Sequence, residues 1–131
     1  MNQEALAARR ENTIREYYTA CEEQDWDVIS ALMHPDVTFQ IADNPPTRTV
    51  AVLRDRVVGS MASKAVTLML IRPQLFIHDR RGDRCVVEIA ITLERADGRR
   101  YAGPGVAVFT FGQDTEIVGY HAFTDEGRFW D

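Results

Sequence analysis

The chain has 131 residues, of which 45% are hydrophobic and 27% are charged, a balance typical of one globular domain with one core. Its formal net charge is −5, which excludes the broad basic face that nucleic acids or anionic membranes require. The N-terminal residues are polar, and every apolar run is too short to span a bilayer. We therefore expect one cytoplasmic domain over residues 1–131, with no nucleic-acid or membrane partner.

The sequence carries no recognisable cofactor motif. Cys21 and Cys85 lack metal-ligand spacing, and we expect both to be reduced thiols. There is no zinc pattern, phosphate-binding glycine loop, nucleophile elbow or dinucleotide fingerprint. We therefore expect no metal and no cofactor, so that any chemistry comes from the side chains of the chain itself.

The first half of the chain predicts three helices and one short strand. Apolar residues recur at helical spacing in residues 3–23 and again in residues 49–62. Asp25 is a good N-cap for a short helix over residues 26–33, which His34-Pro35 ends. Residues 37–42 then predict a strand, and the loop that follows contains two prolines.

The second half predicts four strands joined by short turns. The expected strands cover residues 66–78, 84–95, 99–111 and 116–124, with irregularities at Pro73 and near Gly103-Pro104-Gly105. Helices followed by an antiparallel meander indicate an α+β fold. A long, bent sheet against a few helices makes a cone with an open mouth.

Glu88 lies in the most strongly β-prone stretch, residues 85–93. Alternation places Val87, Ile89, Ile91 and Leu93 on one face of this strand and Glu88 on the other, mixed face. If only the apolar face is covered, Glu88 is an ordinary solvated residue. If both faces are covered, Glu88 lies in a protein-lined space, where a carboxylate needs a partner or a function.

The order of elements, together with specific residues, resembles the nuclear transport factor 2-like superfamily, and within it the SnoaL-like polyketide cyclases and isomerases. The matching residues are Tyr17, residues 25–27, residues 32–39 and residues 116–125. The resemblance covers essentially the whole chain and implies a cone-shaped α+β barrel, in which three N-terminal helices pack on a strongly curved, mainly antiparallel sheet. It implies little about activity, because this fold hosts several chemistries and non-catalytic binders.

The resemblance also shows which known activities the chain lacks. The oxyanion-binding tyrosine of ketosteroid isomerase corresponds to Tyr17, but its general base falls on Ile41, with Asp43 two residues further on as a possible substitute. Its second oxyanion donor falls on Ala107, and the last-strand aspartate of epoxide hydrolases and cyclases falls on Ala122.

The Arg-x-Asp pair of the epoxide hydrolases falls on Glu88 and Ala90. The chain therefore lacks the epoxide hydrolase triad and the full isomerase set, and we expect neither activity.

In this fold the concave face of the sheet lines a pocket, and the convex face commonly forms a homodimer. The resemblance then implies a pocket lined by Phe39, Ile41, Glu88, Ala90, Thr92, Ala107, Phe109, Tyr120 and Ala122. Tyr17 looks in from the first helix, and Arg72 is both a candidate substrate-binding residue and a candidate ion-pair partner of Glu88. The implied dimer face carries Val87, Ile89, Ile91, Val106, Val108 and Phe123.

The leading hypothesis is a dimeric, cofactor-free cyclase or isomerase for a bulky, largely apolar polyketide- or terpenoid-type intermediate. Glu88 would be the pocket acid or base, Tyr17 would stabilise an enolate, and Asp43 would be a further candidate base. The alternative is a non-catalytic small-molecule-binding or dimerisation module, which the alanines at usual catalytic positions favour.

Overall fold

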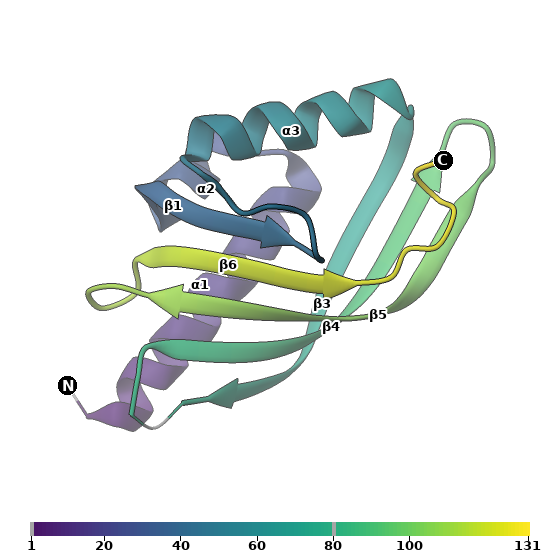
Figure 1. Ribbon diagram of the computed structural model, residues 1–131. Helices are drawn as coiled ribbons and strands as arrows, with labels where there is room; N and C mark the ends of the chain where they lie inside the picture. Colours follow the sequence, from purple (N-terminus) through teal and green to yellow (C-terminus); the bar gives the residue numbers. More distant parts are fainter. Residues whose placement is uncertain (1, 80) are drawn as a thin grey trace.

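The computed structural model describes residues 2–79 and 81–131, which form three helices and one six-stranded sheet. The helices are α1 (Gln3–Glu23), α2 (Trp26–Leu32) and α3 (Val50–Ser63). The strands are β1 (Met33–Ile41), β2 (Thr47–Arg48), β3 (Val66–His78), β4 (Arg84–Arg95), β5 (Arg100–Phe111) and β6 (Ile117–Thr124). The α+β architecture is confirmed (Figure 1). The expected domain also includes Met1 and Arg80, which lie outside the described residues.

Local capping sets the ends of the first two helices. The Asn2 side chain accepts a hydrogen bond from the Ala5 N–H at 2.8 Å, and Gln24 ends α1 in the left-handed conformation with φ 55°. Asp25 caps α2 as expected, accepting from the Val28 N–H at 3.2 Å. Most predicted boundaries are within one residue of those observed, and the exception is β1, which begins at Met33 rather than Val37. A register shift between Met33 and Thr38 accommodates Pro35, which has no N–H to donate.

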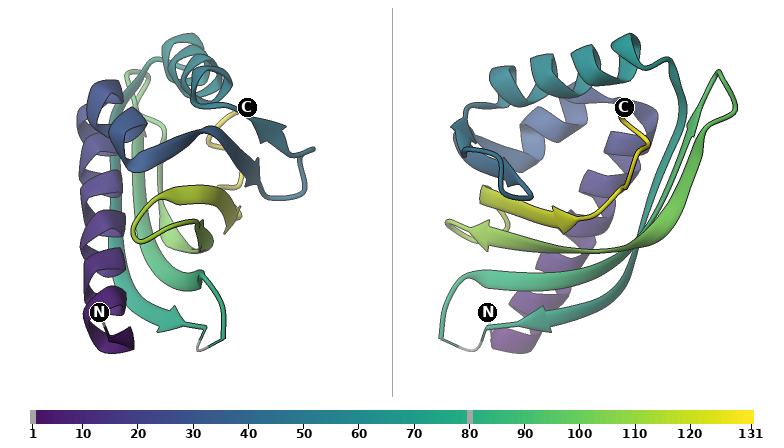
Figure 2. Two further views of the ribbon diagram at one scale, coloured as in Figure 1. Left: turned by 90° about the vertical axis from the view of Figure 1, so that its left-hand side faces the viewer. Right: turned by 45° about the vertical axis from the view of Figure 1, so that its right-hand side comes forward.

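The strand order is β2-β1-β6-β5-β4-β3, with β1 and β6 parallel and the other neighbouring strands antiparallel. The register of β3 shifts between Pro73 and Leu75, where the sequence predicted an irregularity. The short β2 was not predicted. The long strands curve, so that α1 covers one face of the sheet and α3 crosses its end (Figure 2).

The core lies between α1 and the face of the sheet that we call the inner face. On β4 this face consists of Val87, Ile89, Ile91 and Leu93, all of which are buried. Because side chains alternate along a strand, the intervening residues of β4 point to the opposite face, which we call the outer face. On β5 and β6 this outer face carries Val106 and Phe123. The prediction that the apolar face of β4 belongs to the dimer surface is therefore wrong, because helices cover that face within the same chain.

Candidate functional site

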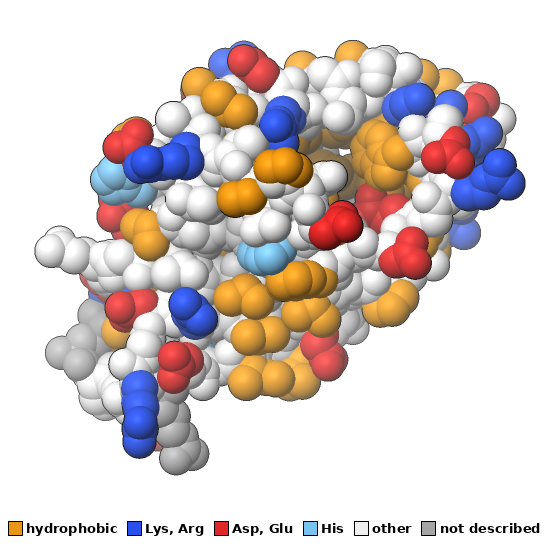
Figure 3. All heavy atoms as spheres, in the orientation of Figure 1, with side chains coloured by type: hydrophobic (Ala, Val, Ile, Leu, Met, Phe, Trp, Pro, Cys, Tyr) orange, Lys and Arg blue, Asp and Glu red, His pale blue; other side chains and the backbone are white. Residues whose placement is uncertain are grey.

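A cavity of about 700 Å³ lies between α3, the inner face of the sheet and the C-terminal segment, residues 125–131. Figure 3 shows it as a hollow beneath α3 with hydrophobic side chains on its walls. The sheet contributes nine apolar wall residues: Phe39, Ile41, Met69, Ile71, Ile89, Ile91, Leu93, Tyr120 and Ala122. Small-molecule sites are typically apolar clefts on the order of 300–1,000 Å³, so this cavity has the size and character of one.

Helix α3 contributes the wall opposite the sheet. Leu53, Arg56, Val57, Ser60 and Met61 line the cavity, at the i, i+3, i+4, i+7 and i+8 spacing of one helical face. Three of these side chains continue the apolar wall, and Arg56 and Ser60 interrupt it.

The end of β6 and the C-terminal segment form a polar part of the cavity wall. Thr124, Glu126 and Trp130 all line the cavity. The Trp130 indole N–H donates to Glu126 Oε1 at 2.6 Å, and the Thr124 hydroxyl donates to Glu126 Oε2 at 2.7 Å. Both oxygens of this carboxylate are therefore held in place from within the chain.

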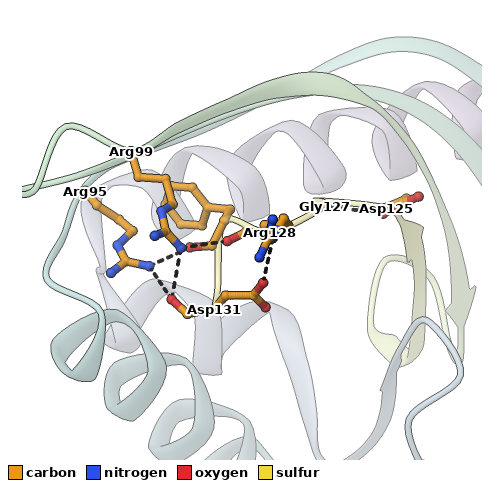
Figure 4. Close-up of polar contacts among 7 residues, drawn as sticks. Arg95, Arg99, Asp125, Gly127, Arg128 and Asp131 are labelled. Atoms are coloured by element: carbon orange, nitrogen blue, oxygen red, sulfur yellow. Dashed lines mark hydrogen bonds and ion pairs between the residues drawn. The ribbon is translucent and has the colours of Figure 1, made fainter.

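Two arginines of the β4–β5 hairpin hold the C-terminal segment against the cavity (Figure 4). Arg95 Nη1 donates to the main-chain oxygens of Phe129 at 2.7 Å and Asp131 at 2.9 Å. Arg99 Nη1 donates to the main-chain oxygens of Arg128 at 2.9 Å and Asp131 at 3.0 Å. The Phe129 ring is buried in the core, so the segment is fixed by both apolar and charge-assisted contacts.

A cluster of buried aromatic rings forms the inner end of the site. Tyr120 lines the cavity, and its ring centroid lies 5.0 Å from that of Phe109 and 5.4 Å from that of Tyr17. The hydroxyls of Tyr18 and Tyr120 are 3.5 Å apart. Burial raises the pKa of Tyr17, Tyr18 and Tyr120 above the ordinary tyrosine value. These hydroxyls therefore stay protonated near neutral pH and can donate hydrogen bonds.

The charged groups of the cavity are few. Among the described residues that line it, Glu126 is the one acidic side chain and Arg56 the one basic side chain. Glu126 and Tyr120 line the same cavity, and a carboxylate can move a proton while a neutral tyrosine hydroxyl stabilises a developing oxyanion. The site thus has the minimum set of groups for acid–base chemistry in an apolar space.

Four of the residues predicted for the pocket line this cavity: Phe39, Ile41, Tyr120 and Ala122. Their role in binding a substrate stays a prediction.

Three further predicted residues lie one layer behind the cavity. Ala107 and Phe109 are buried on the inner face but do not line it, and Tyr17 packs its ring against Tyr120 and Phe109. Tyr17 therefore supports the wall from α1 instead of contacting the cavity.

The predicted placement of Glu88, Ala90 and Thr92 in the pocket is wrong. Glu88 pairs with Val106 across the β4–β5 ladder, and Val87 pairs with Ala107. Directly opposite residues of antiparallel strands share a face, so Glu88 shares the outer face with Val106. Glu88 and Ala90 are exposed and Thr92 is half-buried.

Asp43 and Arg72 also lie away from the cavity. Asp43 is exposed and borders a separate, shallow depression beside His121. Arg72 forms an ion pair with Glu22 of α1, so it is not the partner of Glu88. Glu22 also accepts the Ile71 N–H at 3.1 Å, which caps part of the free edge of β3.

The sequence interpretation missed Glu126, Trp130 and Arg56. The predicted elements ended at Thr124, and no role was predicted for the segment beyond Asp125. A signal was present, because Phe129 and Trp130 are adjacent aromatic residues in a polar stretch and so indicate a segment that packs back onto the core.

The model of the SnoaL-like domain family matches residues 14–120. The chain belongs to this family. The resemblance inferred from the sequence is thereby confirmed. Among curated proteins, none matches the chain significantly.

Several solved structures share the SnoaL-like fold of this chain. A candidate polyketide cyclase from Xanthomonas campestris pv. campestris is 20% identical, covers 90% of this chain and 91% of its own, and has a TM-score of 0.77. TerC, co-crystallised with polyporic acid, is 19% identical, with coverages of 89% and 92% and a TM-score of 0.75. An LEH-like epoxide hydrolase of M. tuberculosis is 15% identical, with coverages of 90% and 84% and a TM-score of 0.73. At these identities the structures show the fold alone.

None of the described helices is both long and apolar enough to cross a membrane. Within residues 2–79 and 81–131 there is no group of three or more His, Cys, Asp or Glu side chains placed to hold a metal ion.

Proposed function

We propose that this SnoaL-like protein is a cofactor-free cyclase or isomerase for a bulky, largely apolar polyketide- or terpenoid-type intermediate. The observation that carries the proposal is the Glu126 carboxylate, held by Thr124 and Trp130 in the wall of an otherwise apolar cavity. The fold shared with a candidate polyketide cyclase and with TerC, which was co-crystallised with polyporic acid, supports a bulky organic substrate. Glu126 replaces Glu88 as the candidate acid–base residue, because Glu88 is on the outer face.

In the proposed reaction, Glu126 removes a proton from a carbon next to a substrate carbonyl. The C–H electron pair forms an enolate, and the Tyr120 hydroxyl donates a hydrogen bond to the enolate oxygen. If Glu126 returns the proton to a different carbon, the double bond migrates. If the enolate carbon attacks a second carbonyl of the same substrate, a C–C bond closes a ring and Glu126 protonates the new alkoxide. Both outcomes conserve atoms and electrons without another reactant.

The shape of the cavity also contributes to the proposed catalysis. A flexible polycarbonyl chain must bring two distant carbons together before a ring can close. Well-oriented intramolecular reactions gain up to about 7–11 kcal/mol from this pre-organisation. Because rigid strands and α3 form the walls, a few charged groups are sufficient for the chemistry.

The shared first step of both reactions can be tested without the natural substrate. We expect the protein to catalyse exchange of the protons next to the carbonyl of 2-tetralone in heavy water, followed by NMR. Glu126→Gln should slow this exchange about 10²–10⁴-fold, as loss of a general base does. Tyr120→Phe should slow it less, because the ring and its packing remain. Unchanged exchange in Glu126→Gln would contradict the proposed function.

Glu88→Gln separates this proposal from the assignment made on the sequence. Glu88 is exposed on the outer face, so we expect exchange at the wild-type rate. A large loss of rate in Glu88→Gln together with a normal rate in Glu126→Gln would restore Glu88 as the base.

A second candidate function is a non-catalytic small-molecule-binding or dimerisation module. The observation that favours it is that both oxygens of Glu126 already accept hydrogen bonds within the chain. In that case the carboxylate holds Trp130 in place and the cavity binds without turnover. Tight binding of 2-tetralone with no detectable proton exchange would support this second function over the first.

We further propose that the protein is a homodimer through the outer face of its sheet. Four apolar side chains on that face are 36–53% exposed: Leu75, Ile77, Val106 and Phe123. Leu75 and Ile77 lie on β3, and Val106 and Phe123 pair across β5 and β6. On β4, which lies between these strands, Val86 pairs with Ile77 and Val108 and continues the apolar surface, whereas Glu88 pairs with Leu75 and Val106 and interrupts it. A contiguous apolar patch is uncommon on a monomer and suits a two-fold interface.

A cytoplasmic location also stays a prediction, which the free thiols Cys21 and Cys85 favour.

A further inference from the structure

One feature of α3 does not fit a helix that only closes an apolar cavity. Its cavity-facing stripe reads Leu53, Arg56, Val57, Ser60 and Met61, so a cation and a hydroxyl interrupt the apolar side chains. Arg56 and Ser60 are four residues apart, and side chains at this spacing are neighbours on a helix. They therefore present a guanidinium and a hydroxyl together at the same part of the wall.

Arg56 and Glu126 differ in whether the chain supplies a partner for their charge. Glu126 accepts hydrogen bonds from Trp130 and Thr124. Arg56 takes part in no ion pair or side-chain hydrogen bond within residues 2–79 and 81–131. Arg56 lines the cavity but is exposed to solvent, so its guanidinium is hydrated and remains available to pair with a planar anion such as a carboxylate, which matches its fork of N–H donors.

We propose that the cavity selects an amphipathic organic anion, whose carboxylate pairs with Arg56 and Ser60 while its apolar body fills the space against the sheet. This inference rests on the cavity of the proposed function and narrows its substrate class to acids. The apolar walls exclude compact anions such as phosphate, because these could not bury hydrocarbon against Ile89, Ile91 and Leu93. The anionic group lies at α3, which leaves the carbonyl end of the same molecule free to reach Glu126 and Tyr120.

A pair of matched probes tests the inference. Biphenyl-4-carboxylate and biphenyl-4-carboxamide have the same apolar body and differ in charge. Binding can be followed by the fluorescence of Trp130, which lines the cavity, in a Trp26→Phe background, and checked by calorimetry. The variants are Arg56→Gln and, as a control, Arg54→Gln; both arginines are exposed residues of α3, but only Arg56 lines the cavity.

We expect the wild-type protein to bind the carboxylate roughly five- to tenfold more tightly than the amide, as a partly exposed charge-assisted contact allows. Arg56→Gln should reduce this ratio to about one by weakening the carboxylate alone, and Arg54→Gln should leave the ratio unchanged. Added salt should lower the ratio in the wild type.

Two results overturn the inference: equal binding of the two probes by the wild type, or a ratio that survives in Arg56→Gln. In both cases the cavity still binds an apolar molecule, so the proposed function stands. Failure of the proposed function is seen separately, as unchanged proton exchange in Glu126→Gln. If neither probe binds, both proposals are refuted, because the cavity is then not a small-molecule site.

Discussion

Replacing Arg95 by methionine should release the C-terminal segment from the cavity while the rest of the fold stays intact. The side chain of Arg95 is mostly buried, and methionine retains its apolar stem. The substitution removes the donors to the main-chain oxygens of Phe129 and Asp131. It also removes an ion pair with exposed Asp97, which contributes little in water.

The expected loss of docking free energy depends on which main-chain oxygens of the C-terminal segment keep a hydrogen-bond donor in the variant. The Asp131 oxygen is also bound by Arg99, so it keeps one hydrogen bond in the variant. The Phe129 oxygen loses the Arg95 donor. A hydrogen bond to a charged group contributes about 1.5–3 kcal/mol, so docking of the segment should weaken by about that amount. Since 1.4 kcal/mol is a factor of about ten, the undocked fraction should rise roughly ten- to hundredfold.

Two measurements can follow the docking of the segment. In a Trp26→Phe background, acrylamide quenching reports how often Trp130 leaves the cavity wall. Hydrogen exchange of the Phe129 and Asp131 amides, which bond to main-chain oxygens within the segment, should accelerate by the same factor. Proton exchange on 2-tetralone should fall as well, because Trp130 and Glu126 move together.

Arg100→Met is the matched control for Arg95→Met. Arg100 is on the same hairpin and pairs with Glu94, without a hydrogen bond to the C-terminal segment. Equal quenching and equal amide exchange in the two variants would refute the reasoning. So would a large loss of global stability in Arg95→Met with Trp130 still protected, since the contact would then stabilise the whole fold and not the segment.

Four other measurements test separate parts of the structure. Ile77→Asp should convert the proposed dimer to a monomer in sedimentation experiments, because it places a charge in the outer apolar patch; a dimer of unchanged mass would refute that interface. Burial raises the pKa of Cys21 from 9.0 to about 12 and that of Cys85 from 9.0 to about 11, so both thiols should react slowly with iodoacetamide at about pH 8 unless urea is added. Because the pKa values of both thiols are raised in the folded state, the stability that the neutral thiols contribute is complete below about pH 9 and is lost as the pH rises toward 11–12. Urea midpoints that do not fall across this pH window would contradict the burial of the thiols. Trp26→Phe should change the free energy of unfolding by less than about 1 kcal/mol, because the loss of apolar area is offset by removal of a buried indole N–H without a partner. A larger loss of stability in urea unfolding would show that water satisfies this N–H.

Features that depend on neighbours in sequence were predictable. The cap at Asp25, the end of α1 at Gln24 and the irregularity at Pro73 all follow from the chemistry of single residues. The order of helices and strands, and with it the SnoaL-like family, could also be read from the sequence because period and turn signals are local. The early start of β1 was missed, since pairing with Ile117 of β6 draws Met33 into the sheet.

The site was only partly predictable. The family resemblance implied that Phe39 and Tyr120 line a pocket, and both line the cavity of the structure. Glu126 was missed, because the chain beyond β6 has no periodic pattern and is held by Arg95 and Arg99, which precede it by about thirty residues. Contacts between residues so far apart in the sequence produce no periodic pattern from which they could be predicted.

The sequence alone determined that β4 has an apolar face and a mixed face, with Glu88 on the mixed one. Only the tertiary structure decided which face is covered. Side chains of a strand alternate between its two faces, so the sequence defines the two sets of residues but not which set faces the core. The pairing of Val87 with Ala107, together with the packing of α1 and α3 on that side, places the apolar face inside and Glu88 outside. The same packing brings Glu126 into the cavity, where the free energy of burying apolar surface favours the docked C-terminal segment.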